Sequence, residues 1–159
     1  VILAASVAGG CAGFLPFNWA PARIFLGDVG SGLVGYTLAT IPFLAPPETR
    51  EKVVLLVGTS LWLFLADATT CLLRRVVRER RWYEPHRQHL YQRWVIAGAS
   101  HARVTSWMVV GSAATSVVAL LAWRTGALAL QWGALALGTA LFALEWRIVR
   151  RREMSHRSA

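Results

Sequence analysis

The stretch that decides the fold is VTSWMVVGSAATSVVALLAW at residues 104–123, which is followed after a short turn by ALALQWGALALGTALFALEW at residues 127–146. The hydrocarbon core of a bilayer is ~30 Å thick, so a spanning helix needs about 20 predominantly apolar residues. Both stretches reach that length, and both are apolar around every face, which is a membrane pattern rather than an amphipathic one. The sequence therefore predicts two membrane-spanning helices joined by a tight turn at residues 124–126.

Three further apolar segments precede this pair, at residues 1–15, 31–45 and 53–73. The whole chain is 55% hydrophobic and only 16% charged, which excludes an ordinary soluble domain. In lipid every backbone N–H and C=O must be paired within its own element, so these segments should also be helices. We therefore expect an all-α fold, a polytopic transmembrane helical bundle of about five segments with the first one truncated. The expected connections are a Pro/Gly-rich loop at 16–30, a turn at 46–52, a basic loop at 74–103 and a basic tail from Arg147.

Basic residues are distributed unequally between the two sides that these segments define. One side receives Arg23, the eight arginines between residues 74 and 103, and the five arginines after residue 146, which together are 14 of the 17 basic residues. Loops rich in Lys and Arg stay in the cytoplasm, so this side and the C-terminus are predicted to be cytoplasmic. The asymmetry explains the net charge of +9 without a nucleic-acid partner.

The chain begins at Val1, inside an apolar stretch and without an initiator Met. We therefore expect residues 1–159 to be the C-terminal half of a single membrane domain whose N-terminal half is missing.

A first constellation of polar residues is NWAPARIFLGDVGS at residues 18–31. It places one acid, Asp28, in a turn between Gly27 and Gly30 just before the segment 31–45, which Ser31 is predicted to cap. A helix N-terminus presents unpaired N–H groups and a partial positive charge, which suit a phosphate. A single carboxylate beside a phosphate suits Mg²⁺. A simple Asx-type turn without a ligand explains the same residues equally well.

The next residues, Gly30 to Gly35, match the dinucleotide pattern G-x-G-x-x-G. That pattern has meaning only within a soluble βαβ unit, whereas here an apolar span follows it. Close helix packing in lipid is the better explanation of these glycines.

A second constellation is EPHRQHLYQR at residues 84–93, in the basic loop. His86, His89, Arg87 and Arg93 lie within eight residues and can together bind a multiply anionic ligand such as a pyrophosphate. A zinc site would need ligands beyond the two histidines. A basic loop lying on anionic lipid headgroups is the alternative.

Asp67 is an acid inside the apolar segment 53–73. Such an acid is costly in a membrane and is a functional candidate by default. A structural partnership with a neighbouring helix is at least as good an explanation.

These motifs resemble the polyprenyl-phosphate N-acetylhexosamine-1-phosphate transferases, which are glycosyltransferases of family 4. The resemblance is strongest over the pattern N…P-A-x-x-F-[ML]-G-D-x-G-S…G, which appears here between Asn18 and Gly35. The branch that uses the muramoyl-pentapeptide has three adjacent histidines, whereas this chain has His86-Arg87-Gln88-His89. The motif of this chain is more similar to that of the branch that initiates O-antigen and exopolysaccharide synthesis with UDP-GlcNAc.

The resemblance implies a role for each matching residue. Asp28 would bind Mg²⁺, Phe25 would stack on the uracil and Asn18 would line the nucleotide pocket. His86, Arg87 and His89 would contact the diphosphate or the sugar. From their places in the two constellations, Gly27, Ser31 and Arg93 join the substrate-binding set.

The implied function is transfer of the sugar-1-phosphate of a UDP-N-acetylhexosamine to undecaprenyl or another polyprenyl phosphate, with release of UMP. The implied location is the bacterial inner membrane, with the active site facing the cytoplasm. The family's tandem aspartates are absent from this chain, so we expect this part of the enzyme alone to be inactive. A non-catalytic membrane scaffold and a transporter fragment that uses Asp67 as its coupling acid are the alternatives.

Overall fold

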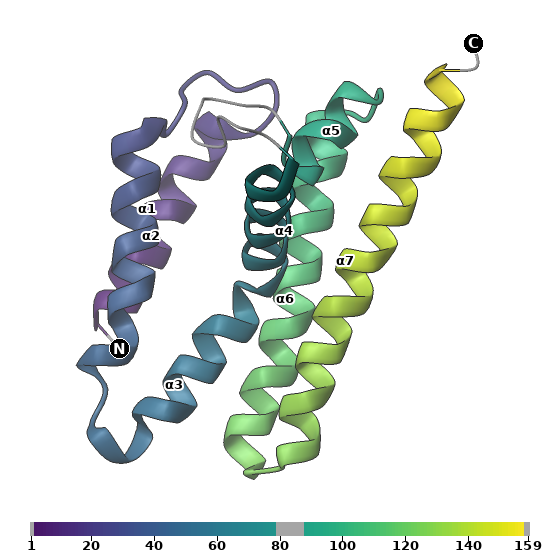
Figure 1. The fold of residues 1–159 in the computed structure, drawn as a ribbon. Coiled ribbons are helices and arrows are strands. Elements are labelled where there is room, and N and C mark those ends of the chain that lie inside the picture. The colour runs from purple at the N-terminus through teal and green to yellow at the C-terminus, as the bar shows by residue number, and fades with distance from the viewer. Residues whose placement is uncertain (1, 79–87, 158–159) are drawn as a thin grey trace. The chain divides into compact units, whose positions relative to one another are not determined.

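The computed structural model describes residues 2–78 and 88–157, with side chains up to Ser155 in the last helix. Within these residues the structure contains seven α-helices, one short 3-10 helix and no strand, so the predicted all-α class is confirmed (Figure 1). The chain divides into two compact units, residues 1–57 and 58–159, and each is described by itself.

The first unit contains α1 (Ile2–Asn18), α2 (Gly27–Thr40), the 3-10 helix η1 (Ile41–Leu44) and most of α3 (Pro47–Ser60). Helix α3 begins with a proline and has Glu48 in its first turn, which are both typical of a helix N-terminus. The turn expected at residues 46–52 is therefore wrong, because most of it is the start of this helix.

The second unit is built on an antiparallel hairpin of α6 (His101–Thr125) and α7 (Leu128–Arg157). Gly126 joins the two helices in the left-handed conformation with φ 67°, so the predicted tight turn is confirmed. Helix α4 (Trp62–Arg78) packs against both hairpin helices. The short α5 (Leu90–Ile96) lies near the start of α6 and the end of α7, away from the turn that joins them (Figure 1).

Small residues let the helices of this unit approach closely. The side of α6 that is buried includes Gly111, Thr115 and Ala119, and α7 buries Ala134 and Gly138. A Cβ atom added to Gly138 would lie 2.6 Å from Cδ1 of Trp62 in α4. Contacts between small residues are the usual way in which membrane helices pack, because lipid provides no hydrophobic force between them.

The segment expected as one helix at residues 53–73 is broken at Leu61, between α3 and α4. Gly58 and Ser60 precede the break, and sharp kinks in helices commonly occur at such residues. A sequence pattern of continuous apolarity does not reveal a break of this kind.

In the part of the chain that the structure describes, two helices are long and apolar enough to cross a membrane, at His101–Thr125 and Leu128–Ser155, and the bent pair α3–α4 would make a third. The expected segments at residues 1–15 and 31–45 correspond mainly to α1, with 17 residues, and α2, with 14 residues, which are both shorter than the ~20 residues that a spanning helix needs. The protein is thus an all-α, multi-pass membrane protein, although fewer than five of its segments have the full spanning length.

The basic regions also contain more helix than predicted. Helix α4 continues to Arg78, α5 lies inside the expected loop, and α7 continues through the expected tail from Arg147 to Arg157. Arginine is a good helix former, and α5 buries Leu90 and Trp94 on one face against the hairpin. The prediction that residues 74–103 form only a loop and that a tail begins at Arg147 is therefore wrong in part, because these basic segments include helix.

Candidate functional site

The first candidate site lies where α1 ends and α2 begins, and backbone hydrogen bonds shape the connection. The backbone N–H groups of Arg23 and Ile24 both donate to the carbonyl of Phe17, at 2.8 and 3.2 Å. The side-chain amide of Asn18 donates to the carbonyl of Ile24 at 3.0 Å. Asn18 therefore closes this loop, and its amide is committed to the backbone.

Asp28 lies in the first turn of α2 rather than in a turn before it. It is exposed, and its carboxylate forms no hydrogen bond or ion pair within the described part of the chain. Gly27, directly before it, has φ 69°, a backbone conformation that a side chain would strain. An exposed carboxylate at a helix N-terminus is open to a ligand and faces the positive end of the helix dipole.

Ser31 does not cap α2, so that expectation is wrong. The helix begins four residues earlier, at Gly27, and the Ser31 hydroxyl donates to the carbonyl of Asp28 inside the helix at 3.1 Å. Leu26 occupies the position before the helix and makes no side-chain capping hydrogen bond.

Phe25 is 79% exposed, so its ring is available for stacking but has no partner ring in the described residues. An apolar cavity of about 410 Å³ lies between α1 and α2 and is lined by Asn18 and Leu26 among mostly aliphatic side chains. Apolar groups fit this cavity better than a phosphate does.

Mg²⁺ usually binds one or two carboxylates together with substrate phosphates and waters. Asp28 fits such an ion as a single carboxylate ligand, and the helix N-terminus beside it suits the phosphates that would share the ion. No cluster of three or more His, Cys, Asp or Glu side chains occurs among the residues that the structure describes, so these residues do not form a complete metal cage.

The second candidate site surrounds His89, at the N-terminus of α5. His86 and Arg87 lie outside the described residues. Asp67 of α4 is 6% exposed, and one of its oxygens, Oδ1, accepts a hydrogen bond from the backbone N–H of Leu90 at 2.7 Å. Its other oxygen, Oδ2, lies 3.4 Å from Nδ1 of His89. The interior acid of the apolar segment therefore fixes the end of α5 and the position of the imidazole.

Neighbouring side chains complete the setting of His89. Its backbone N–H donates to the amide oxygen of Gln92 at 3.3 Å, and its ring stacks on Tyr91 with centroids 5.6 Å apart. Burial, followed by the charge of Asp67, raises the pKa of Tyr91, so its phenol stays protonated at neutral pH. On the α4 side, Arg74 donates to the side-chain oxygen of Gln88 at 3.2 Å.

Arg93 already has a carboxylate partner. Its Nε and Nη2 atoms donate to the two oxygens of Glu153 in α7 at 2.8 and 2.6 Å. This hydrogen bond raises the pKa of Arg93, and the guanidinium lies 5.6 Å from the ring centroid of Trp146. In this arrangement Arg93 joins α5 to α7, and a substrate phosphate would have to compete with Glu153 for it.

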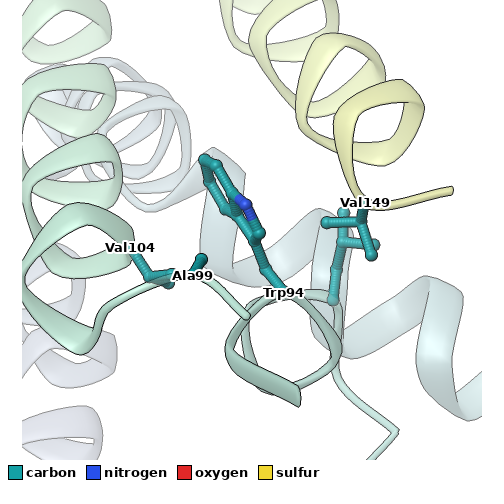
Figure 2. Close-up of a cluster of buried hydrophobic side chains, with 5 residues drawn as sticks. Trp94, Ala99, Val104 and Val149 are labelled. Atoms are coloured by element: carbon teal, nitrogen blue, oxygen red, sulfur yellow. The ribbon is translucent and has the colours of Figure 1, made fainter. Parts of the chain in front are cut away.

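Trp94 anchors the opposite face of α5. It is 4% exposed and packs with Ala99, Val104 and Val149, so its indole lies between α6 and α7 (Figure 2). Its ring also meets Trp107 edge to face at 6.0 Å. The helix that carries His89 and Arg93 is therefore held by α4, α6 and α7 together.

Reasoning from the sequence missed two acids of α7, Glu145 and Glu153. Glu145 is 2% exposed within the second candidate span, and Glu153 is the partner of Arg93. Glu145 could have been noticed in the sequence, because it is a single acid inside an apolar stretch. No pattern in the sequence links Glu153 to Arg93, because that contact depends on how α5 docks.

Asp28 belongs to the first unit and His89 to the second. The structure thus brings Asn18, Phe25, Gly27, Asp28 and Ser31 into one region, and it brings Asp67, His89 and Arg93 into another.

Comparison with known proteins gives consistent matches. Residues 1–45 match the family described as Glycosyl transferase family 4. The chain is 31% identical over 146 residues to the decaprenyl-phosphate N-acetylglucosaminephosphotransferase of Mycobacterium leprae. The aligned stretch covers 81% of this chain and 37% of that protein. It is 30% identical over 90 residues to a probable undecaprenyl-phosphate N-acetylglucosaminyl 1-phosphate transferase of Bacillus subtilis, which is 56% of this chain and 25% of the relative.

A third relative is the phospho-N-acetylmuramoyl-pentapeptide-transferase of Heliobacterium modesticaldum, 42% identical over 71 residues, which is 45% of this chain and 20% of that protein. The chain thus spans well under half the length of these curated relatives. No solved structure matches it.

Proposed function

Because this chain belongs to glycosyl transferase family 4, we propose that it forms part of an enzyme that transfers a sugar-1-phosphate from a UDP-N-acetylhexosamine to a polyprenyl phosphate. The observation that carries the proposal is Asp28. It lies within the residues that match the family and presents an exposed carboxylate, without a protein partner in the described chain, at the N-terminus of α2.

The proposed reaction forms one bond and breaks one. An oxygen of the polyprenyl phosphate attacks the β-phosphorus of the UDP-sugar, and the bond from that phosphorus to the bridging oxygen breaks, so UMP leaves. Such a transfer depends on positioning and on neutralising charge more than on covalent help from the protein. When bound, Mg²⁺ would neutralise phosphate charge.

The proposal gives a task to several residues of this chain. Asp28 would hold Mg²⁺, and the exposed ring of Phe25 would stack on the uracil. Asn18 would act indirectly, because its amide closes the loop that carries Phe25. His89, held by Asp67, would donate to a phosphate or sugar oxygen, and His86 and Arg87 would act with it.

We further propose UDP-GlcNAc as the sugar donor in initiation of a cell-envelope polysaccharide such as O-antigen. The relatives include enzymes named for N-acetylglucosamine and for the muramoyl-pentapeptide, so the choice rests on the sequence His86-Arg87-Gln88-His89, which lacks three adjacent histidines. The proposed location is the inner membrane with the basic connections in the cytoplasm.

The test is UMP release by the intact enzyme with a polyprenyl phosphate, Mg²⁺ and UDP-GlcNAc or UDP-MurNAc-pentapeptide. We expect Asp28→Asn to reduce turnover by at least about 100-fold, as removal of a key transition-state contact typically does. The matched control is Thr40→Ala, which removes only the hydrogen bond that the Thr40 hydroxyl donates to the carbonyl of Thr37 inside the same helix. Equal turnover of Asp28→Asn and the unchanged enzyme would remove Asp28 from the mechanism, and faster turnover of the pentapeptide substrate would overturn the choice of donor.

A further inference from the structure

A cavity of about 700 Å³ lies where α4, α5 and the end of α7 meet, entirely within the second unit. Four arginines line it: Arg74 and Arg78 from α4, Arg93 from α5 and Arg150 from α7. The cavity is built from residues of the second unit, whereas the motif at 18–35 belongs to the first unit.

Among the described residues that line this cavity, the positive charge is only partly compensated. The one carboxylate of this set, Glu153, is bound by Arg93. Arg74 donates to Gln88, which is neutral, and the exposed Arg78 and Arg150 form no ion pair or hydrogen bond with other described residues. Like charges that face one space repel, so an anion in the cavity would stabilise the arrangement. Arginine is also the side chain best suited to bind a phosphate with two parallel hydrogen bonds.

The remaining wall is mostly apolar. Leu73 is 60% exposed, Met154 is 62% exposed, and Trp146 also lines the cavity. The apolar run of α7 ends at Trp146 and arginines follow it, so the cavity lies at the end of a candidate membrane span, where lipid meets water. A tryptophan at such a boundary is typical of membrane proteins. The wall thus suits a ligand that carries both a phosphate and hydrocarbon.

We propose that this cavity binds the phosphate headgroup of an anionic phospholipid, with Arg78 and Arg150 as its main contacts and with the glycerol and upper acyl chain against Leu73 and Met154. Basic pockets between membrane helices are a known means of binding such headgroups. The site would connect the composition of the membrane to the docking of α5, because Arg93 and Glu153 line the same cavity. This inference does not depend on the proposed transferase reaction.

The test uses the intact protein with the double variant Arg78→Gln, Arg150→Gln. Both side chains are exposed and have no described partner, so the fold should be kept. The protein is titrated with phosphatidylglycerol in phosphatidylcholine nanodiscs, and the retained lipid is counted by native mass spectrometry. We expect about five-fold weaker retention for each arginine removed, which corresponds to about 1 kcal/mol for each charge.

The matched control is Arg147→Gln, Arg151→Gln, which removes the same charge from exposed positions on α7 outside the cavity wall. Retention that falls in the cavity variant and not in the control supports the proposal. An equal fall in both would show general surface attraction and overturn it. Displacement of the lipid by an equal concentration of inorganic phosphate, or equally tight binding of soluble glycerophosphoglycerol, would also overturn it, because the ligand would then be a soluble phosphate.

Discussion

Replacing Asp67 by alanine should release the N-terminus of α5 while leaving most of the hairpin intact. The buried carboxylate accepts a hydrogen bond from the N–H of Leu90 at 2.7 Å and faces Nδ1 of His89 at 3.4 Å. A hydrogen bond to a charged group contributes ~1.5–3 kcal/mol, and a buried N–H left without a partner costs a similar amount. We take about 2 kcal/mol as the loss, which corresponds to roughly 30-fold more frequent opening of this turn.

The assay is hydrogen–deuterium exchange of the peptide that covers residues 88–96, in the intact protein in nanodiscs. The 30-fold estimate predicts faster exchange at the amide of Leu90 and its neighbours, with little change in α6. Asp67→Asn should have a smaller effect, because an amide oxygen can still accept from Leu90. The matched control is Asp28→Asn, which alters the other aspartate of the chain, in the first unit. Unchanged exchange at residues 88–96 in Asp67→Ala would refute the idea that this acid holds α5.

Three further predictions concern backbone strain, packing and ion pairing. Gly27→Ala should lower the free energy of unfolding by about 1–2 kcal/mol, because φ is 69° there, and an unchanged melting temperature would contradict this. Gly138→Ala should cost about 1–3 kcal/mol, since the new Cβ would lie 2.6 Å from Trp62, and it would be measured as a lower melting temperature in detergent. A stability equal to that of the unchanged protein would mean that the indole moves aside freely. Glu153→Gln should cost about 1 kcal/mol or less, because its ion pair with Arg93 is part-exposed, and should speed exchange in α5 and in the end of α7 together. Faster exchange in only one of them would argue against a direct link.

The apolar segments and the tight turn could be predicted from the sequence because length and continuous apolarity are local properties. The break at Leu61 was not predictable in that way, since its small residues, Gly58 and Ser60, also occur in unbroken membrane helices. Helix α5 was missed for a related reason. Its seven residues, Leu90–Ile96, are too few to be stable alone, and they are helical because Trp94 is buried between α6 and α7.

The same distinction between local sequence and helix packing applies to the residues of the candidate sites. Asp28 stands out as a candidate in the sequence because its glycine-rich surroundings form a long and specific pattern, and its role stays a prediction. Asp67 was recognised as unusual, but its partners, His89 and Leu90, are more than twenty positions away and depend on how the helices pack. The pairing of Arg93 with Glu153 spans sixty residues and has no local signature.

The docking of α5 has a practical consequence for any mutational scan of this protein. Val149 and Trp107 lie on helices that contain no member of either motif, yet both belong to the packing around Trp94. Substitutions there would loosen the short helix that follows His89, and in the proposed transferase they would lower turnover without removing a group that contacts substrate. A screen scored by activity alone would group such positions with catalytic residues, although they act by holding α5 in place. A parallel measurement of hydrogen exchange in α5 would separate these packing residues from residues that contact substrate.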